Sequence, residues 1–381
     1  MLRTTSFDSI DLVFCAMGSL EEQYVIEEDE GLLNRGPTDR KVLYLGAAPN
    51  RYYPFSLFSE DCGWKEIGNI VLSRTKVVFF SNKINLLVPC GPLAVLVDLV
   101  TGHQGSVFLL SLLGTIPLAE RLGWVTEQLA FYTGPTVGGL LNATFGNATE
   151  LIISIHAMKS GMIRVVQQSL LGSILSNMLL VLGSAFFSGG IVHSNKEQVF
   201  NKDESEADGS SDDKEAPKIT NWESIIWLFI LTASISFLSE YLVNAIEGAS
   251  VALDIPVAFI SVILLPIVGN AAEHASAVMF AIKDELDMSL GVAVGSSTQI
   301  SMFGIPFCVV YGWVLGHPMD LNFQLFETAT LFMTVLVVAF MLQEGTSNYF
   351  KGLMLLFCYL IVAASYFVHI DPESIRDKPE T

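Results

Sequence analysis

The 381 residues carry only 15% charged side chains and 51% hydrophobic ones, and their mean hydropathy is +0.51. A soluble domain carries roughly 25% charged residues, so this composition predicts a membrane protein with several spans. The formal net charge of −19 is concentrated in an N-terminal segment and in the acidic run 203–215, and it excludes nucleic acid as an obvious partner.

Residues 1–80 are polar to mixed, and nine of the 20 Lys and Arg residues precede the first apolar segment, which predicts a cytosolic N-terminus. A polar, acidic linker without any apolar run occupies 193–221. Around it we expect nine membrane spans, some of which contain glycine or proline where a helix can break. Their approximate bounds are 84–101, 106–128, 135–158, 163–188, 222–247, 255–282, 286–315, 321–343 and 350–369.

A five-residue motif occurs twice in these apolar segments, as Gly146-Asn147-Ala148-Thr149-Glu150 and as Gly269-Asn270-Ala271-Ala272-Glu273. The copies are 123 positions apart, and the same spacing separates Gly172-Ser173 from Gly295-Ser296. A carboxylate near the middle of a bilayer costs about 2.5–3.5 kcal/mol, so it indicates a function. Two such carboxylates in a repeat predict a transporter whose ion site lies at the repeat interface.

The residue types of the motif suit a hard cation. Glycine lets a helix loosen and expose backbone carbonyls, asparagine supplies an amide oxygen, and glutamate supplies a negative charge. Ca²⁺ takes six to eight oxygen ligands at roughly 2.3–2.6 Å, and these are the donors that the motif offers. The alternative is that glycine and asparagine serve close helix packing, with each glutamate paired or protonated in the core.

Four further glutamates form two pairs with equal spacing, Glu120 with Glu127 and Glu240 with Glu247. The members of each pair are two helical turns apart and share one helix face. They either line an approach to the middle of the membrane or relay protons, or they are interfacial charges near span ends. In the second case the adjacent Arg121 would offset Glu120.

Other polar residues within apolar spans are secondary candidates. His274 points about 100° away from the preceding glutamate, so it is at best a neighbour of the site. Ser296 and Gln299 either complete a cation shell or make hydrogen bonds between helices, and Ser176-Asn177 invites the same two interpretations. Glu327 is an acid for which the sequence offers no partner.

The motif copies, the longer segment Leu265-Pro266-Ile267-Val268-Gly269-Asn270-Ala271-Ala272-Glu273-His274 and the segment Gly295-Ser296-Ser297-Thr298-Gln299-Ile300-Ser301 resemble the cation-binding repeats of the plant-type vacuolar cation/proton exchangers. These proteins belong to the calcium/cation antiporter superfamily, and the resemblance covers roughly residues 70 to 370. It implies an all-α polytopic membrane protein with the inverted-repeat antiporter fold, in which one extra helix precedes two five-helix repeats.

The resemblance implies the following organisation: a cytosolic regulatory tail (1–80), the extra span (84–101), an incomplete first repeat (106–188), an acidic linker (193–221), the second repeat (222–369) and a C-terminal tail (370–381). It further implies exchange of Ca²⁺, or of another divalent cation, for protons across the vacuolar membrane. Ca²⁺ and H⁺ are then substrates and no cofactor is expected. The chain is not expected to be an enzyme, since it contains no HExxH or GxSxG motif.

Carried over by position, Glu150 and Glu273 would bind the cation directly through their carboxylates. The loosened backbone at Gly146-Asn147 and at Gly269-Asn270 would supply carbonyl ligands. Because a buried carboxyl favours its neutral form and an adjacent cation favours the charged form, the same pair would hold either Ca²⁺ or protons.

The chain departs from this family in one respect. Nothing between 189 and 221 corresponds to the spans 321–343 and 350–369, so we count nine spans where the family has eleven. The gap is typical of an alternatively spliced product. A second hypothesis is therefore a transport-inactive isoform that binds or regulates a full-length exchanger, and a homo-oligomer is also left open.

The gap predicts a structural weakness. Helices 135–158 and 163–188 would lack neighbours, and polar groups such as Asn147 and Asn177 would face lipid, which cannot satisfy them. Glu150 would then lack a rigid support. On this argument we expect the chain to insert into a membrane but to transport poorly or not at all.

Overall fold

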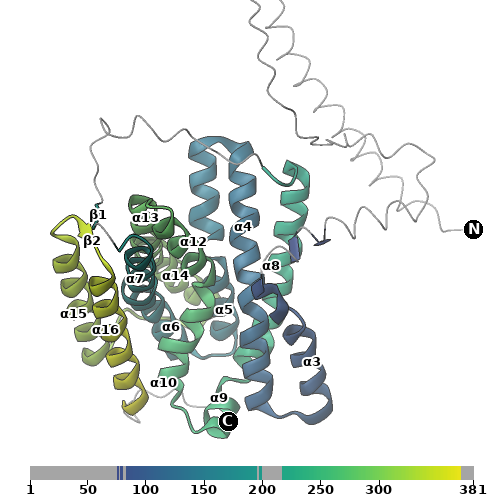
Figure 1. Cartoon of the computed structure of the whole chain (residues 1–381). Helices are drawn as coiled ribbons and strands as arrows, with labels where there is room; N and C mark the ends of the chain where they lie inside the picture. The colour runs from purple at the N-terminus through teal and green to yellow at the C-terminus, as the bar shows by residue number, and fades with distance from the viewer. Residues whose placement is uncertain (1–74, 77, 80–82, 195–196, 200–216, 370–381) are drawn as a thin grey trace, which may run out of the picture. The chain divides into compact units, whose positions relative to one another are not determined.

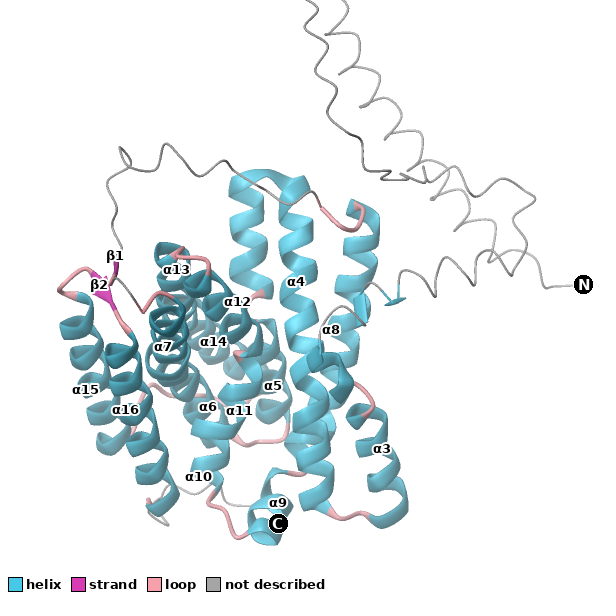
Figure 2. Ribbon diagram, in the orientation of Figure 1, coloured by secondary structure: helices cyan, strands magenta, loops and turns pink. Residues whose placement is uncertain are grey.

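A computed structural model describes residues 75–76, 78–79, 83–194, 197–199 and 217–369 of the chain. The predicted cytosolic tail lies outside these residues except for a few positions at its end, and the acidic run and the C-terminal tail also lie outside them. The described part is a bundle of helices with a small two-stranded sheet at its edge (Figures 1 and 2).

The half of the chain before the linker contains the predicted extra span and three further predicted spans. Its longest helix, α4, folds back on itself. This is shown by the close approach of Gly138 to Ala130: a methyl group on Gly138 would lie 3.1 Å from Cβ of Ala130. A straight helix would hold residues eight positions apart at about 12 Å. The elements are η1 (Lys83–Leu87), α3 (Cys90–Thr101), α4 (Gln104–Phe145), α5 (Ala148–Lys159), α6 (Ile163–Leu175), the π-helical turn η2 (Ser176–Val181) and α7 (Leu182–Val192).

The half after the linker begins with a capping box, in which the Thr220 side chain accepts from the Glu223 amide and the Glu223 carboxylate accepts from the Thr220 amide. The elements are α8 (Asn221–Asn244), α9 (Ile246–Leu253), α10 (Val257–Phe259), the π-helical turn η4 (Ile260–Leu264), α11 (Leu265–Gly269), α12 (Ala271–Ile282), α13 (Leu286–Gln299), the π-helical turn η5 (Ile300–Gly304), α14 (Ile305–Leu315), α15 (Leu325–Leu342) and α16 (Tyr349–Val368). Strand β1 (Gln198–Val199) pairs antiparallel with β2 (Thr346–Ser347), so the start of the linker is fixed beside the turn between α15 and α16.

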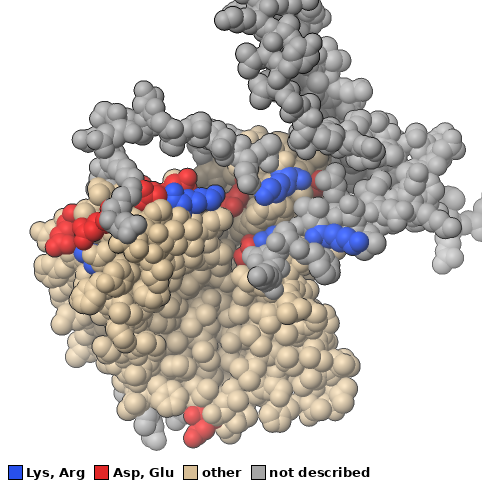
Figure 3. Space-filling model, viewed as in Figure 1, with Lys and Arg blue, Asp and Glu red and all other residues tan. Residues whose placement is uncertain are grey.

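Seven helices of the described part are long and apolar enough to cross a membrane, or up to eight if a pair bent by 117° counts as one span. Two of the nine predicted spans, 135–158 and 255–282, are each divided by a helix break, which accounts for the lower number. On the face shown in Figure 3, the charged side chains of the described residues gather near the ends of the bundle, and the surface between them is uncharged. This arrangement is typical of a protein embedded in a bilayer.

The prediction that helices of the first repeat lack neighbours is wrong for the span 163–188. Helices α15 and α16 pack against α6, η2 and α7, so the continuous span Ile163–Val192 is 78% buried. The equivalent span of the second repeat, Leu286–Leu315, is only 22% buried. The last two helices of the second repeat thus cover α6 to α7 of the first, and α13 to α14 is the more exposed of the two equivalent spans.

The centre of the bundle is built from both halves of the chain. Apolar side chains of α6, α11 and η5 pack together in one core cluster, among them Leu170, Leu265 and Ile300. The polar residues Asn147 and Asn177 are buried beside this core, with 4% and 0% of their surfaces exposed, so they do not face lipid as predicted.

Candidate cation site

Both copies of the motif interrupt a helix. Helix α4 ends at Phe145 and α5 begins at Ala148, while α11 ends at Gly269 and α12 begins at Ala271. The asparagine of each copy precedes the new helix without capping it through its side chain, so each carboxamide is available for contacts elsewhere. The glutamate of each copy lies in the first turn of the new helix, where the helix dipole favours a negative charge.

The carboxyl group of the first copy lies against the backbone of the second. A methyl group on Gly269 would be 2.7 Å from Oε1 of Glu150, so the absence of a side chain at this glycine makes room for the carboxylate. Glu150 and Glu273 are 3% and 7% exposed. Three of their four carboxylate oxygens have no hydrogen-bond partner among the described residues: both oxygens of Glu150 and Oε2 of Glu273.

The carboxamide of Asn147 is held by helix α13 of the opposite repeat. Its Nδ2 donates to Oε1 of Gln299 at 2.7 Å, and its Oδ1 accepts from the Ser296 hydroxyl at 2.9 Å. Nδ2 of Asn177 donates to the same hydroxyl oxygen at 2.9 Å, and that oxygen lies 3.5 Å from Oε1 of Glu273. Ser296 therefore joins both repeats at the centre of the site.

Asn270 is held more loosely than its counterpart in the first copy. Its Nδ2 donates to the backbone carbonyl of Ser173 at 3.2 Å, and its Oδ1 has no partner among the described residues. Nδ1 of His274 lies 2.8 Å from the Asn270 carbonyl oxygen. His274 is thus a neighbour of the motif, as its position on the helix predicts.

The two secondary acidic candidates lie apart from this centre. Glu120 is buried and forms an ion pair with Arg121, which is the structural alternative considered for it. Glu240 is exposed and lines a cavity of about 300 Å³ together with Asp98, Gln104 and Tyr241. The carboxylates of Glu150 and Glu273, in contrast, are buried together with the two motifs.

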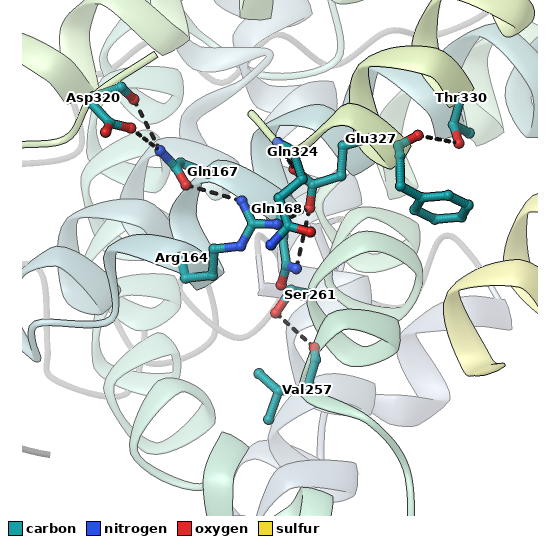
Figure 4. Close-up of polar contacts among 10 residues, drawn as sticks. Arg164, Gln167, Gln168, Val257, Ser261, Asp320, Gln324, Glu327 and Thr330 are labelled. Carbon is teal, nitrogen blue, oxygen red and sulfur yellow. Dashed lines mark hydrogen bonds and ion pairs between the residues drawn. The ribbon is translucent and has the colours of Figure 1, made fainter. Parts of the chain in front are cut away.

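Glu327 does have a partner, contrary to the sequence-based expectation. Arg164 of α6 forms a buried ion pair with it, and Gln168 donates to its Oε1 at 3.3 Å (Figure 4). Arginine is rare in apolar spans and is nearly always paired there. Arg164 within the predicted span 163–188 was the signal in the sequence that could have found this pair.

The buried oxygens that lack partners define the chemistry of the site. Besides the carboxylates they comprise Oδ1 of Asn270, Oδ1 of Asn177 and the hydroxyl of Ser173. No group of three or more His, Cys, Asp and Glu side chains suited to a metal ion occurs in the described part of the chain, so a soft or transition-metal centre is not indicated there. Two carboxylates surrounded by neutral oxygens suit a hard divalent cation.

Residues 103–205 and 223–368 match the model of the sodium/calcium exchanger protein family, and the chain therefore belongs to this family. Its relatives include plant vacuolar exchangers. The chain is 59% identical to the vacuolar cation/proton exchanger 2 of Oryza sativa subsp. japonica, with 81% of this chain and 86% of the relative covered. It is 58% identical to the vacuolar cation/proton exchanger 5 of Arabidopsis thaliana, with 82% and 87% covered.

The rice alignment extends over 377 residues although it covers only 81% of the 381 residues of this chain. It therefore contains positions that have no residue here, which agrees with the predicted absence of two helices.

Among solved structures, the chain is similar to native YfkE, with a TM-score of 0.66 and 33% identity over 75% of this chain and 100% of that one. Selenium-substituted YfkE, described as a Ca²⁺/H⁺ antiporter protein, gives a TM-score of 0.65 at 32% identity, with 75% and 99% covered. The predicted antiporter fold is confirmed.

Proposed function

We propose that this protein exchanges Ca²⁺ for protons, and that Glu150 and Glu273 bind the cation. The observation that carries this proposal is the pair of buried carboxylates at the repeat interface, one of which lies against the glycine of the opposite motif. Buried polar groups are nearly always hydrogen-bonded, and a carboxylate without partners indicates a ligand or proton site. The names of the relatives support cation/proton exchange.

The two substrates compete for the same oxygens. A carboxyl group that is removed from water favours its neutral form, and a divalent cation beside it favours the ionised form. Loading Ca²⁺ therefore releases protons, and loading protons releases Ca²⁺. The carboxamide of Asn270 and the hydroxyl and amide groups of Ser173 and Asn177 would complete the shell of oxygens around the cation.

The vacuolar membrane is the proposed location, supported by the vacuolar relatives and the apolar helices. The N-terminus is placed in the cytosol because basic residues concentrate before the first span. In this orientation an acidic lumen would load protons onto the site and drive Ca²⁺ out of the cytosol.

The test is ⁴⁵Ca²⁺ uptake driven by a pH gradient into proteoliposomes that contain the purified full chain. Glu150→Gln and Glu273→Gln should each abolish uptake, because each removes a charged ligand and a proton carrier. Glu344→Gln is the matched control, since Glu344 is 71% exposed and lies in the turn after α15. Near-normal uptake by either site variant would reject the assignment.

The second candidate function is a transport-inactive isoform that binds a complete exchanger. The uncovered span Leu286–Leu315 favours it, because this surface is where the two absent helices would pack by analogy with α15 and α16. Uptake by the purified chain without any full-length partner separates the two functions. The sequence-based argument for poor transport was that Glu150 would lack a rigid support. Because Glu150 is buried in the structure, this argument no longer favours inactivity.

A further inference from the structure

A buried network ties the first turn of α6 to the start of α15 (Figure 4). Arg164 and Glu327 form an ion pair in which 8% and 1% of the side chains are exposed. The second carboxylate oxygen of Glu327 accepts from the Gln324 amide at 3.2 Å. Next to the pair, Nε2 of Gln167 donates to Oδ1 of Asp320 at 2.9 Å, so the loop before α15 is held as well.

Helix α6 connects this network to the candidate cation site. Ser173 lies nine residues after Arg164, about 13 Å along the helix. Its backbone carbonyl accepts the hydrogen bond from Asn270, and the neighbouring Gly172 allows α6 to touch the backbone of η4 at Val262. A shift of α6 at its first turn would therefore move the group that orients the carboxamide of Asn270.

The first motif does not depend on such an anchor. Asn147 is held by the side chains of Ser296 and Gln299, whereas Asn270 is held through a backbone carbonyl whose place depends on α6. The residue equivalent to Arg164 in the second repeat, 123 positions later, is Asp287, an exposed acid. The ion pair thus serves one half of the site and is not a general feature of the repeat.

We propose that Arg164 and Glu327 are positioning residues for the cation site. They fix α6 against α15 and thereby set the position of the Ser173 carbonyl and of Oδ1 of Asn270. The effect on Ca²⁺ rests on the proposed function, while the effect on the geometry of α6 does not.

The first measurement is the dissociation constant for Ca²⁺, obtained by equilibrium dialysis with ⁴⁵Ca²⁺ on the purified full chain in detergent. Loss of a group that supports a metal site typically weakens binding about 10–100-fold, so Arg164→Gln and Glu327→Gln should each weaken it at least about tenfold. The double variant should recover affinity to within a few-fold, because it leaves no unpaired buried charge and the two amides can bond to each other. Glu344→Gln, which removes the exposed partner of Lys351 beyond the other end of α15, should leave affinity unchanged.

The second measurement needs no Ca²⁺. Ser173→Cys is introduced alone and together with Arg164→Gln, and the labelling rate by a hydrophilic thiol reagent is read from the peptide that contains position 173. Ser173 is 0% exposed, so labelling should be slow with the ion pair intact and several-fold faster without it.

Unchanged Ca²⁺ affinity and unchanged labelling in the single variants, together with a lower melting temperature, would show that the pair only stabilises the fold and would overturn the proposal. If the parent chain binds no Ca²⁺, the proposed function fails. The labelling rate then still decides whether Arg164 and Glu327 position α6.

Discussion

Gly172→Ala should separate α6, which carries Ser173, from η4, the π-helical turn shortly before the second motif. The added methyl group would lie 2.2 Å from the carbonyl oxygen of Val262 and 2.7 Å from its Cα. These are backbone atoms that cannot rotate away, and ordinary contact begins at 3.4 Å, so α6 and η4 must move apart by about 1 Å. Overpacking of this kind costs about 1–3 kcal/mol of stability.

The same displacement should impair Ca²⁺ binding. Ser173 follows the altered residue, and the bond from Asn270 to its carbonyl is already 3.2 Å long, so an additional 1 Å breaks it. The assay combines a thermal melt of the purified chain with ⁴⁵Ca²⁺ dialysis. The expected result is a lower melting temperature together with a loss of affinity.

Gly295→Ala is the matched control, because Gly295 is the equivalent residue of the second repeat and a methyl group there meets nothing within 4 Å. Alanine is preferred over glycine in helices by roughly 1 kcal/mol, so this variant should be neutral or slightly stabilised. Equal behaviour of the two variants would refute the argument that the contact between α6 and η4 organises the site.

Three further outcomes are expected. Ser296→Ala should lower stability by about 1–3 kcal/mol in chemical denaturation, because it leaves Oδ1 of Asn147 buried without its donor; a change below the error of the measurement would contradict this. Gly269→Ala should weaken ⁴⁵Ca²⁺ binding with little change in melting temperature, since the methyl group meets side-chain atoms of Glu150 rather than backbone. Replacing the acids of the run 203–215 by amides should raise the apparent KM for uptake more than it lowers the maximal rate, most clearly at low salt, and a complete loss of turnover would speak against a role limited to local cation concentration.

The repeat and its broken helices were accessible from the sequence because both are local signals. A polar motif within an apolar run must satisfy its groups inside the protein, since lipid offers no hydrogen bonds, and two copies at one spacing indicate a shared centre. The structure does bring Glu150 of one copy against Gly269 of the other. The composition predicted a membrane protein with several spans, and the resemblance to the vacuolar exchangers implied the antiporter fold.

The sequence could not predict which distant helices pack against each other. Helical periodicity shows which face of a segment is polar but not which helix covers it. Glu327 and Arg164 are 163 residues apart, and a lone arginine in an apolar span indicates that it has an acidic partner but not which acid that is. For the same reason we expected the spans 321–343 and 350–369 to pack against helices of their own repeat. In the structure, α15 and α16 pack against α6 and α7 of the first repeat.

The two half-sites are unequal although their motifs are nearly identical, and the difference lies in how the carboxamide of each asparagine is held. Asn147 meets Ser296 and Gln299, whose hydroxyl and long amide side chain reach both atoms of its carboxamide. The position equivalent to Gln299, 123 residues earlier, is Ser176, whose side chain is shorter, and Nδ2 of Asn270 bonds instead to the backbone carbonyl of Ser173. Oδ1 of Asn270 has no partner among the described residues and would be open to the proposed cation, while Oδ1 of Asn147 accepts from the Ser296 hydroxyl.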